Sequence, residues 1–409
     1  MQIKILDVLK KNPMLVALLV IIVFFDIWIR YATNTTLFAP RNVTNLIAQN
    51  GHIIILATGM LICILTGGNI DLSIGSMLCL VAALGGTLIV RWDNVVYLGN
   101  FILLHGNLYT SIAICLLFGT LLGAIQGFWI AYVRIPAFIV TLAGMLAYRG
   151  LAIVLLGGMT ISSMPGDFLF IFGGRGGFLP VLPPGADTAL RMNTALLVGA
   201  AICALVLAVQ LYSRFSKLRK NYEVEAPVWM WVRLLAICAV VMGMFYSFGR
   251  DRGIPVVLII VGVVVLVYYY FTSKTVPGRY LYAMGGNEKA AKLSGIDTNR
   301  VLFFAYTNMG FLTAVAAMVC MARFDSAFPD LGRGFELDAI GSCFIGGASA
   351  YGGIGTVGGT LIGTVFMGIL NNGMSILGIS VNWQQAVKGA VLLAAVAFDV
   401  ISKKRKGAV

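Results

Sequence analysis

Residues 53–76 read IIILATGMLICILTGGNIDLSIGS: a long apolar run, a Gly-Gly pair at 67–68, and the start of a second apolar run. The first run belongs to a predicted helix over 48–66, and the second to a predicted helix over 72–90. A helix of about 20 apolar residues crosses about 30 Å of hydrocarbon, so both are candidate membrane spans. The backbone between them must be satisfied by protein or by a wet cavity, because lipid offers it no partners.

The same kind of run recurs along all 409 residues. Hydrophobic residues make up 59% of the chain and charged residues 11%, whereas a soluble domain has about 45–50% and about 25%. This composition excludes a soluble or disordered protein. We expect an all-α fold, a polytopic bundle of about 10–12 transmembrane helices with broken or re-entrant Gly-rich segments, in a single domain over 1–409. The candidate spans are 14–32, 48–66, 72–90, 108–133, 137–157, 194–213, 230–248, 254–272, 302–321, 337–355, 356–374 and 383–401.

The positive charge of the chain is predicted to lie on one side of the membrane. The formal net charge is +13, from 29 basic and 16 acidic residues. The predicted loops of one side, together with both ends of the chain, hold this whole excess, and the remaining charges balance. Basic loops mark the cytoplasmic side, so both termini and the loop 273–300 are expected in the cytoplasm, and the loop 157–193 outside. A nucleic-acid-binding protein would instead need one folded basic domain.

Few residues in the chain could carry catalytic, metal or cofactor chemistry. The seven cysteines lie in apolar runs without metal-ligand spacing, and there are only two histidines, so no metal site is expected. Gly353–Gly358 matches the pattern GxGxxG, but no acid follows between Asp338 and Asp399, as a dinucleotide site would require. No Walker lysine motif is present, so the chain is expected to be no enzyme and to bind no cofactor itself.

The cytoplasmic loop contains a predicted short helix. Asn287 can cap a helix that begins at Glu288, an acid favoured in the first turn. Glu288 and Lys292 stand at i, i+4 and could pair, and Gly295 could end the helix. A short, capped helix of this kind could transmit motion between a membrane subunit and a cytoplasmic subunit that supplies the energy. The alternative is an ordinary solvated loop with one helical turn.

These motifs resemble those of a known family. The pattern Gly-Gly-Asn-Glu-x-Ala-Ala-x-Leu-Ser-Gly-Ile at 285–296 is similar to the coupling helix of sugar-importing ABC permeases of the ribose, xylose and galactose type. Residues 69–76 resemble the Ile-Asp-Leu-Ser-Val-Gly-Ser block of that family, with Ile74 where valine is usual. Residues 134–142, 148–150 and 368–389 match as well. The resemblance covers nearly the whole chain and is greatest to the xylose or multiple-monosaccharide subgroup.

The resemblance implies a transport subunit with partners. It implies a second copy or an equivalent permease, a cytoplasmic ABC ATPase that binds ATP and Mg²⁺, an extracytoplasmic sugar-binding protein, and the bacterial inner membrane. The residues implied in contact with the ATPase are Gly286, Asn287, Glu288, Ala291, Lys292, Leu293, Ser294 and Gly295.

Polar and aromatic residues in the apolar runs are candidates for the translocation path, because polar groups at membrane depth are costly and functional. Lys388 and Gln384 should share a helix face, and ion pairs are expected for Lys388 and Arg149. The candidates are Asn69, Asp71, Ser73, Phe138, Asn371, Asn372, Trp383, Gln384, Gln385 and Lys388.

The run 337–355 is the least regular candidate span, with five glycines between 346 and 355. It could span, re-enter, or unwind inside the bundle. We expect this break at membrane depth, far from the cytoplasmic loop. It weakly echoes the break at 67–68, as in transporters with duplicated broken elements, although Gly-rich packing would look the same.

Other functions remain open at this point. One is an ABC permease for branched-chain amino acids or nucleosides. Another is an ion-coupled secondary transporter, for which Asp71 is the one candidate acid. A third is a membrane enzyme, which would need a cluster of His, Cys or carboxylate side chains, whereas the acidic residues of this chain are scattered.

Overall fold

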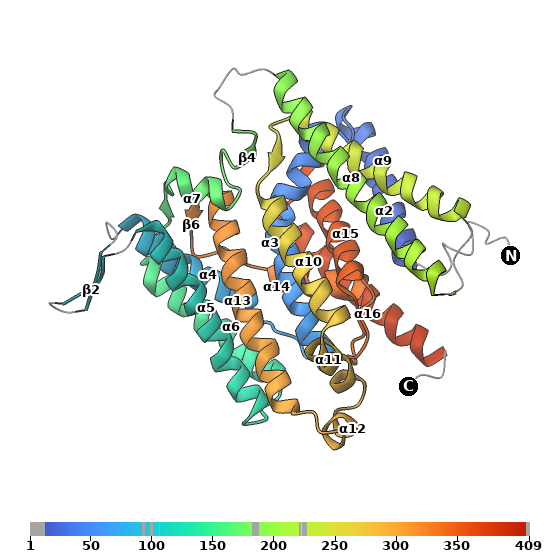
Figure 1. Ribbon diagram of the computed structural model, residues 1–409. Coiled ribbons are helices and arrows are strands. Elements are labelled where there is room, and N and C mark those ends of the chain that lie inside the picture. Colours follow the sequence, from blue (N-terminus) through green and yellow to red (C-terminus); the bar gives the residue numbers. More distant parts are fainter. Residues whose placement is uncertain are drawn as a thin grey trace.

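The computed structural model describes residues 13–91, 95–98, 101–105, 107–181, 188–220, 222 and 227–405. The basic terminal segments 1–11 and 406–409, and the parts of the external and cytoplasmic loops at 182–187 and 223–226, lie outside the described residues. The chain forms a helical bundle with a few short strands (Figure 1).

In chain order the elements are α2 (Pro13–Thr33), α3 (Pro40–Leu65), α4 (Ile74–Gly86), the π-helical turn η1 (Thr87–Arg91), β1 (Val95–Leu98), β2 (Phe101–His105), α5 (Leu108–Ala131), α6 (Ala137–Leu156), β3 (Ile161–Ser162), α7 (Gly166–Ile171), β4 (Phe178–Leu179), α8 (Thr188–Arg219), α9 (Pro227–Arg250), β5 (Ile254–Pro255), α10 (Val257–Lys274), α11 (Val276–Gly286), α12 (Glu288–Leu293), α13 (Thr298–Phe324), β6 (Ser326–Ala327), α14 (Phe335–Ile345), α15 (Val357–Ile376) and α16 (Val381–Arg405).

The predicted polytopic helical bundle is confirmed. Within the described residues, nine helices are long and apolar enough to cross a membrane: α2, α3, α5, α6, α8, α9, α10, α13 and α16. Three of the twelve predicted spans are missing from these nine. The run 72–90 is split between α4 and η1, the run 356–374 forms α15 with the polar pair Asn371-Asn372, and the run 337–355 forms only a short helix.

The prediction of a span over 337–355 is wrong for a continuous helix. Only α14, of 11 residues, is helical there. The chain then unwinds from Gly346 to Gly355, and Thr356 caps α15 by accepting a hydrogen bond from the Gly359 amide at 3.0 Å. Four glycines in this break have positive φ angles, which side chains with a Cβ rarely adopt. Of the three open alternatives, the segment therefore unwinds.

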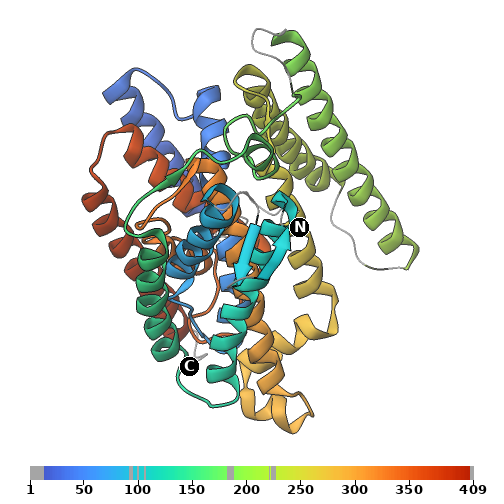
Figure 2. The same cartoon turned by 90° about the vertical axis from the view of Figure 1, so that its left-hand side faces the viewer.

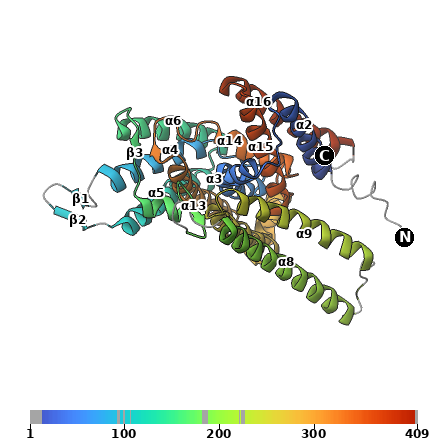
Figure 3. The ribbon, with the colours of Figure 1, turned by 90° about the horizontal axis from the view of Figure 1, so that it is seen from above.

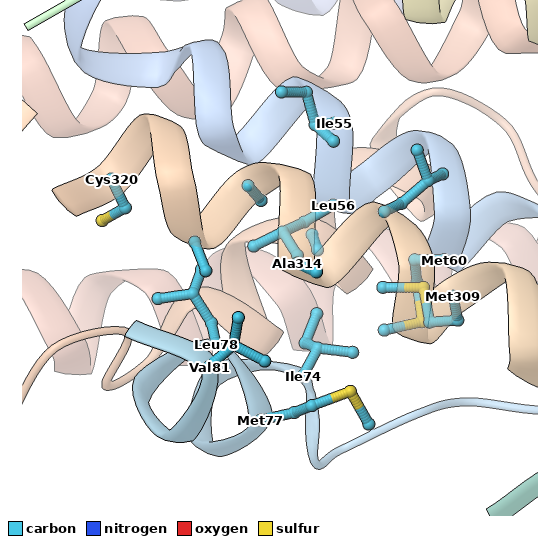
Figure 4. Packing of buried hydrophobic residues seen from close by; sticks show 14 of the residues in the cluster. Ile55, Leu56, Met60, Ile74, Met77, Leu78, Val81, Met309, Ala314 and Cys320 are labelled. Carbon is cyan, nitrogen blue, oxygen red and sulfur yellow. The ribbon is translucent and has the colours of Figure 1, made fainter. Parts of the chain in front are cut away.

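The core of the bundle is built around α3 and α13, the two helices with the most buried side chains. Residues of α3, α4 and α13 interdigitate there (Figure 4). Gly123 of α5 faces Gly310 of α13 so closely that a Cβ on either would overlap the backbone of the other. Small residues allow this approach where no hydrophobic force pulls membrane helices together.

The hairpin of α8 and α9 lies at the edge of the molecule and extends away from it (Figure 3). In α8 only Ala195 and Gly199 are buried. Its apolar side chains, such as Leu205 and Val209, are exposed, as expected for lipid-facing helices.

The contacts at the two ends of the bundle define the topology. At one end β3 pairs with β6 and β4 pairs with β5, so residues 161–179 of the loop after α6 meet the segments that follow α9 and α13. At the other end lie α11 and α12 (Figure 2). There the Met14 side chain fills the space beside Gly347, and the Ala350 amide donates to Asp399 Oδ2 at 3.4 Å. The start of α2 and the end of α16 therefore lie on the same side as the loop 273–300, as predicted for the two termini.

Candidate functional site

The short helix predicted at 288 is α12, and its ends are as expected. Asn287 Oδ1 accepts from the Ala290 amide at 3.0 Å, which caps the first turn. Gly295 has φ of 84°, and the Ile296 amide donates to the Ala291 carbonyl at 3.1 Å. Local hydrogen bonds of this kind depend on nearby residues only, so the sequence could predict them.

A second helix, α11, precedes α12 and was not expected. Pro277 stands in the first turn of α11, where its missing amide is no loss. The Thr275 hydroxyl caps that turn by accepting from the Gly278 amide at 3.1 Å. Gly285 and Gly286 are the last two residues of α11. We call α11 and α12 together the coupling segment, residues 276–293.

The predicted pair between Glu288 and Lys292 is wrong. Glu288 Oε1 instead accepts from Arg134 Nη1 at 2.6 Å. Arg134 lies in the loop between α5 and α6 and also donates to Thr298 Oγ1 at 3.2 Å and to Asn299 Oδ1. A partner 154 residues away could not be found from helix spacing.

The outer face of α12 is open to solvent. Ala291 is its one buried residue. Glu288, Lys289, Lys292 and Leu293 are exposed, and Leu293 is 90% exposed. An apolar tip on a capped, charged helix is suited to fill a pocket on a protein partner.

The inner end of the coupling segment packs directly on the backbone of α3 and of the break 346–356. The Gly353 amide donates to the Leu65 carbonyl at 3.1 Å, and Gly285 fits against both groups so closely that a Cβ there would overlap them. The Tyr282 hydroxyl donates to the Gly355 carbonyl at 3.0 Å, and burial raises the pKa of Tyr282. The expectation that the break lies far from the cytoplasmic loop is therefore wrong, because α11 returns the chain to the end of α3.

The two Gly-rich breaks also meet. Gly352 lies against the backbone of Gly67, and Gly68 against the Ala350 carbonyl, with no space for a Cβ at either glycine. We call this meeting of residues 65–68, 285–286 and 350–355 the glycine junction. It joins the ends of α3 and α11 to the start of α15.

Asp71 and Ser73 form a buried network beside this junction. Asp71 is 0% exposed, and its Oδ1 accepts from the amide and the hydroxyl of Ser73 at 2.9 and 2.7 Å. The Ser73 hydroxyl in turn accepts from Gln126 Nε2 of α5 at 2.8 Å. Asn69 is half-buried and donates to Thr66 Oγ1 at 3.2 Å. In this conformation, Asp71 and Ser73 are sealed inside the chain.

A second polar cluster joins α14, α15 and α16. Lys388 Nζ lies 2.9 Å from Asp338 Oδ2, with side chains 16% and 3% exposed. Asn371 Nδ2 donates to the same oxygen at 3.3 Å. The expected ion pair of Lys388 is confirmed. Its partner Asp338 was missed, because it lies 50 residues away on another helix, where helix spacing gives no information.

The other path candidates lie around this cluster or on exposed faces. Gln384 is half-buried like Lys388 and donates to the Ile379 carbonyl at 2.8 Å, in agreement with the predicted shared face. Asn372 is buried. Gln385 and Trp383 are exposed on α16, and Phe138 is exposed on α6.

The prediction of an ion pair for Arg149 is wrong. Its Nη1 donates to the backbone carbonyls of Pro329 and Leu331, at 2.8 and 2.9 Å. Arg323, which was not singled out, similarly donates to the Gln49 carbonyl at 2.7 Å. Both arginines hold the backbone of neighbouring segments. Across the described part of the chain, no group of three or more His, Cys, Asp or Glu could hold a metal ion.

A bundle of lipid-facing apolar helices around broken, polar elements, with a solvent-exposed helix at one end, defines a polytopic membrane transport protein. Comparison with protein families identifies the kind. Residues 42–396 match the family described as "Branched-chain amino acid transport system / permease component", and the chain belongs to this family.

Several curated relatives are similar over nearly their whole length. The xylose transport system permease protein XylH of Haemophilus influenzae is 35% identical, over 97% of this chain and 98% of that protein. The xylose transport system permease protein XylH of Escherichia coli K12 is 34% identical, over 97% of this chain and 93% of that protein. The ribose import permease protein RbsC of Escherichia coli K12 is 30% identical, over 96% and 94%. The comparison with solved structures found no match.

Proposed function

We propose that this chain is the membrane permease subunit of an ATP-driven importer of a monosaccharide. The observation that carries the proposal is the likeness to xylose and ribose permeases over more than nine-tenths of both chains. The family description favours a second substrate class, branched-chain amino acids. The sugar is preferred because the individual relatives that match at 30–35% identity carry it in their names.

The proposed assembly contains two permease subunits, cytoplasmic ATPase subunits that bind ATP and Mg²⁺, and an extracytoplasmic sugar-binding protein, in the inner membrane of a bacterium. The exposed face of α12 supports an ATPase docking site, with Leu293 as its apolar anchor. The excess of basic residues on that side supports a cytoplasmic location. The whole chain acts as one permease domain.

Transport follows from the contacts of the coupling segment. When the ATPases close on ATP, they displace α12 and, through the short connection at Asn287, α11. Because Gly285 contacts backbone on both α3 and the break, α11 cannot move without shifting the glycine junction. Movement there changes the inner end of α3 and α15 together, which is the end that must open to the cytoplasm.

The substrate path is proposed along α15 and α16. Asn371, Gln384, Gln385 and Lys388 offer donors and acceptors for sugar hydroxyls, and Trp383 offers an aromatic face. Phe138 and Asn372 could contribute at its edge. Asp71, Ser73 and Asn69 would join the path only if α4 and α5 separate, since the first two are now buried.

The test is reconstitution of the complete transporter in liposomes with its ATPase and binding protein. Uptake of labelled xylose, ribose and leucine is measured with and without ATP on the side of the membrane that holds the ATPase subunits. We expect ATP-dependent pentose uptake. Uptake of leucine alone would transfer the proposal to amino acids, and sugar uptake driven by an ion gradient without ATP would overturn the ABC assignment.

A further inference from the structure

Arg134 occupies an unusual position in the loop of residues 132–136 between α5 and α6. Its φ angle is 65°, a left-handed conformation that a non-glycine residue adopts rarely. Such a conformation persists where the surrounding contacts over-determine it, and it often marks a functional position. Pro136, two residues later, is the N-cap of α6.

The Arg134 side chain binds two other elements at once. Nη1 donates to Glu288 in the first turn of α12 at 2.6 Å. Nη2 donates to Thr298 at 3.2 Å and to Asn299, both in the first turn of α13. The planar guanidinium has five donors in a fixed fork, so one residue can hold three acceptors in one geometry.

These contacts link α12 to the membrane helices by a second route. The first route is the backbone, which runs back through α11 to the glycine junction and forward through residues 294–297 to α13. The second runs from Glu288 through Arg134 to the start of α6 and to α13. Since Ala291 is the single buried residue of α12, little apolar packing holds the helix on this side.

We infer that Arg134 is a positioning residue that fixes α12 to the starts of α6 and α13, so that displacement of α12 is passed to both helices. The inference rests on the proposed role of α12 as the site of ATPase docking. The Arg134 and Glu288 side chains are 41% and 44% exposed, and exposed pairs contribute little to stability. Loss of the link should therefore impair coupling without unfolding the chain.

The experiment uses the full chain assembled with its ATPase and binding protein. The variants are Arg134→Gln, which removes the charge, Arg134→Lys, which keeps it without the fork, and Arg134→Gly, which suits the φ angle but has no side chain. Arg300→Gln is the matched control, because Arg300 is a cytoplasmic arginine whose ion pair, with Asp297, is local and exposed.

Two quantities are measured. One is sugar uptake per ATP hydrolysed, at equal amounts of co-purified ATPase. The other is the distribution of distances between spin labels at Lys289 of α12 and Ile139 of α6, both exposed, in a background with Cys203 and Cys238 replaced. For Arg134→Gln and Arg134→Gly we expect uptake per ATP to fall about five-fold or more, the lower end of typical coupling between sites. We also expect a broader distance distribution.

Arg134→Lys should recover part of both quantities, and Arg300→Gln should match the wild type. The inference is overturned if Arg134→Gln leaves either quantity unchanged, or if Arg300→Gln changes both to the same degree. A wild-type assembly that shows no ATP-dependent uptake would refute the proposed function instead. The distance measurement would then still decide whether Arg134 holds α12 to α6.

Discussion

At the scale of single residues, the buried pair of Lys388 and Asp338 carries the largest expected energetic effect. The two charges lie 2.9 Å apart with little exposure, on different helices. Removing one partner from such a pair leaves the other charge buried and alone, at a cost of about 3–5 kcal/mol. The short helix α14 would also lose a link to α16.

We therefore predict that Lys388→Met lowers the midpoint of thermal unfolding in detergent and abolishes sugar uptake. The double variant Asp338→Leu, Lys388→Met should recover most of the stability, because an apolar pair of similar volume can replace a buried ion pair. Asn382→Ala, at an exposed position on the same helix that is given no role in the substrate path, is the control. An unfolding midpoint of Lys388→Met equal to that of the wild type would contradict the prediction.

Residues were predicted well where the interaction is local. The Asn287 cap and the Gly295 terminator depend on a few neighbouring positions, and both were confirmed. The partners of Glu288 and Lys388 lie 154 and 50 residues away. Helix spacing carries no information about such pairs, so Arg134 and Asp338 could be found only from the fold.

At the scale of elements, the glycine junction offers a test with a built-in control. Gly285 and Gly286 are adjacent at the end of α11, yet a Cβ at Gly285 would overlap the Leu65 carbonyl and the Gly353 backbone, whereas a Cβ at Gly286 meets nothing within 4 Å. Helix propensity alone would favour alanine at both positions.

We predict that Gly285→Ala strongly reduces ATP-dependent uptake, because α11 must move away from α3, and that Gly286→Ala leaves uptake near the wild-type level. Uptake in liposomes and the amount of bound ATPase are measured for both variants. Equal uptake by the two variants would show that the close contact at Gly285 has no role in transport.

The break itself should respond in the same way. Gly352→Leu with Gly353→Leu places side chains into the backbones of Gly67 and Gly286. We expect loss of uptake together with faster reaction of a cysteine at position 291, the buried position of α12, with a water-soluble maleimide, since α11 and α12 are displaced. A labelling rate unchanged from the wild type would mean that the break does not support the coupling segment.

Elements were predicted best where an apolar run is long and unbroken. The bounds of α2, α5 and α6 lie within a few residues of the expected spans. The failures came from residues with two possible meanings. A proline such as Pro277 can end a helix or begin one, and the helix α11 was therefore missed. Glycines can lie within a helix or interrupt it, and the predicted helix over 337–355 was therefore longer than α14.

At the scale of the whole molecule, charge and contacts give the same topology. The start of α2, the end of α16 and the coupling segment share one end of the bundle, and residues 161–179 of the loop after α6 lie at the other. The contacts alone do not say which end is cytoplasmic. The excess of basic residues predicts that the end with the coupling segment is cytoplasmic, because basic loops are retained inside.

We predict that a cysteine at Arg175 reacts with a membrane-impermeant maleimide in intact spheroplasts, whereas one at Lys289 reacts only after the membrane is opened. Both positions are exposed. The chain with its native cysteines is the control, since five of the seven are buried and the other two are half-buried. Labelling of position 289 from outside would reverse the orientation.

The glycine junction also sets an order on biosynthesis. Its three parts, at 65–68, 285–286 and 350–355, are far apart in the chain, and the hydrogen bond from Gly353 to Leu65 closes it. The ribosome must therefore release residue 353 before the coupling segment can rest in its final position. In a nascent or truncated chain that ends before α14, α11 would pack against the end of α3 without the contact from Gly353, so α12 would be held less firmly until the chain is complete.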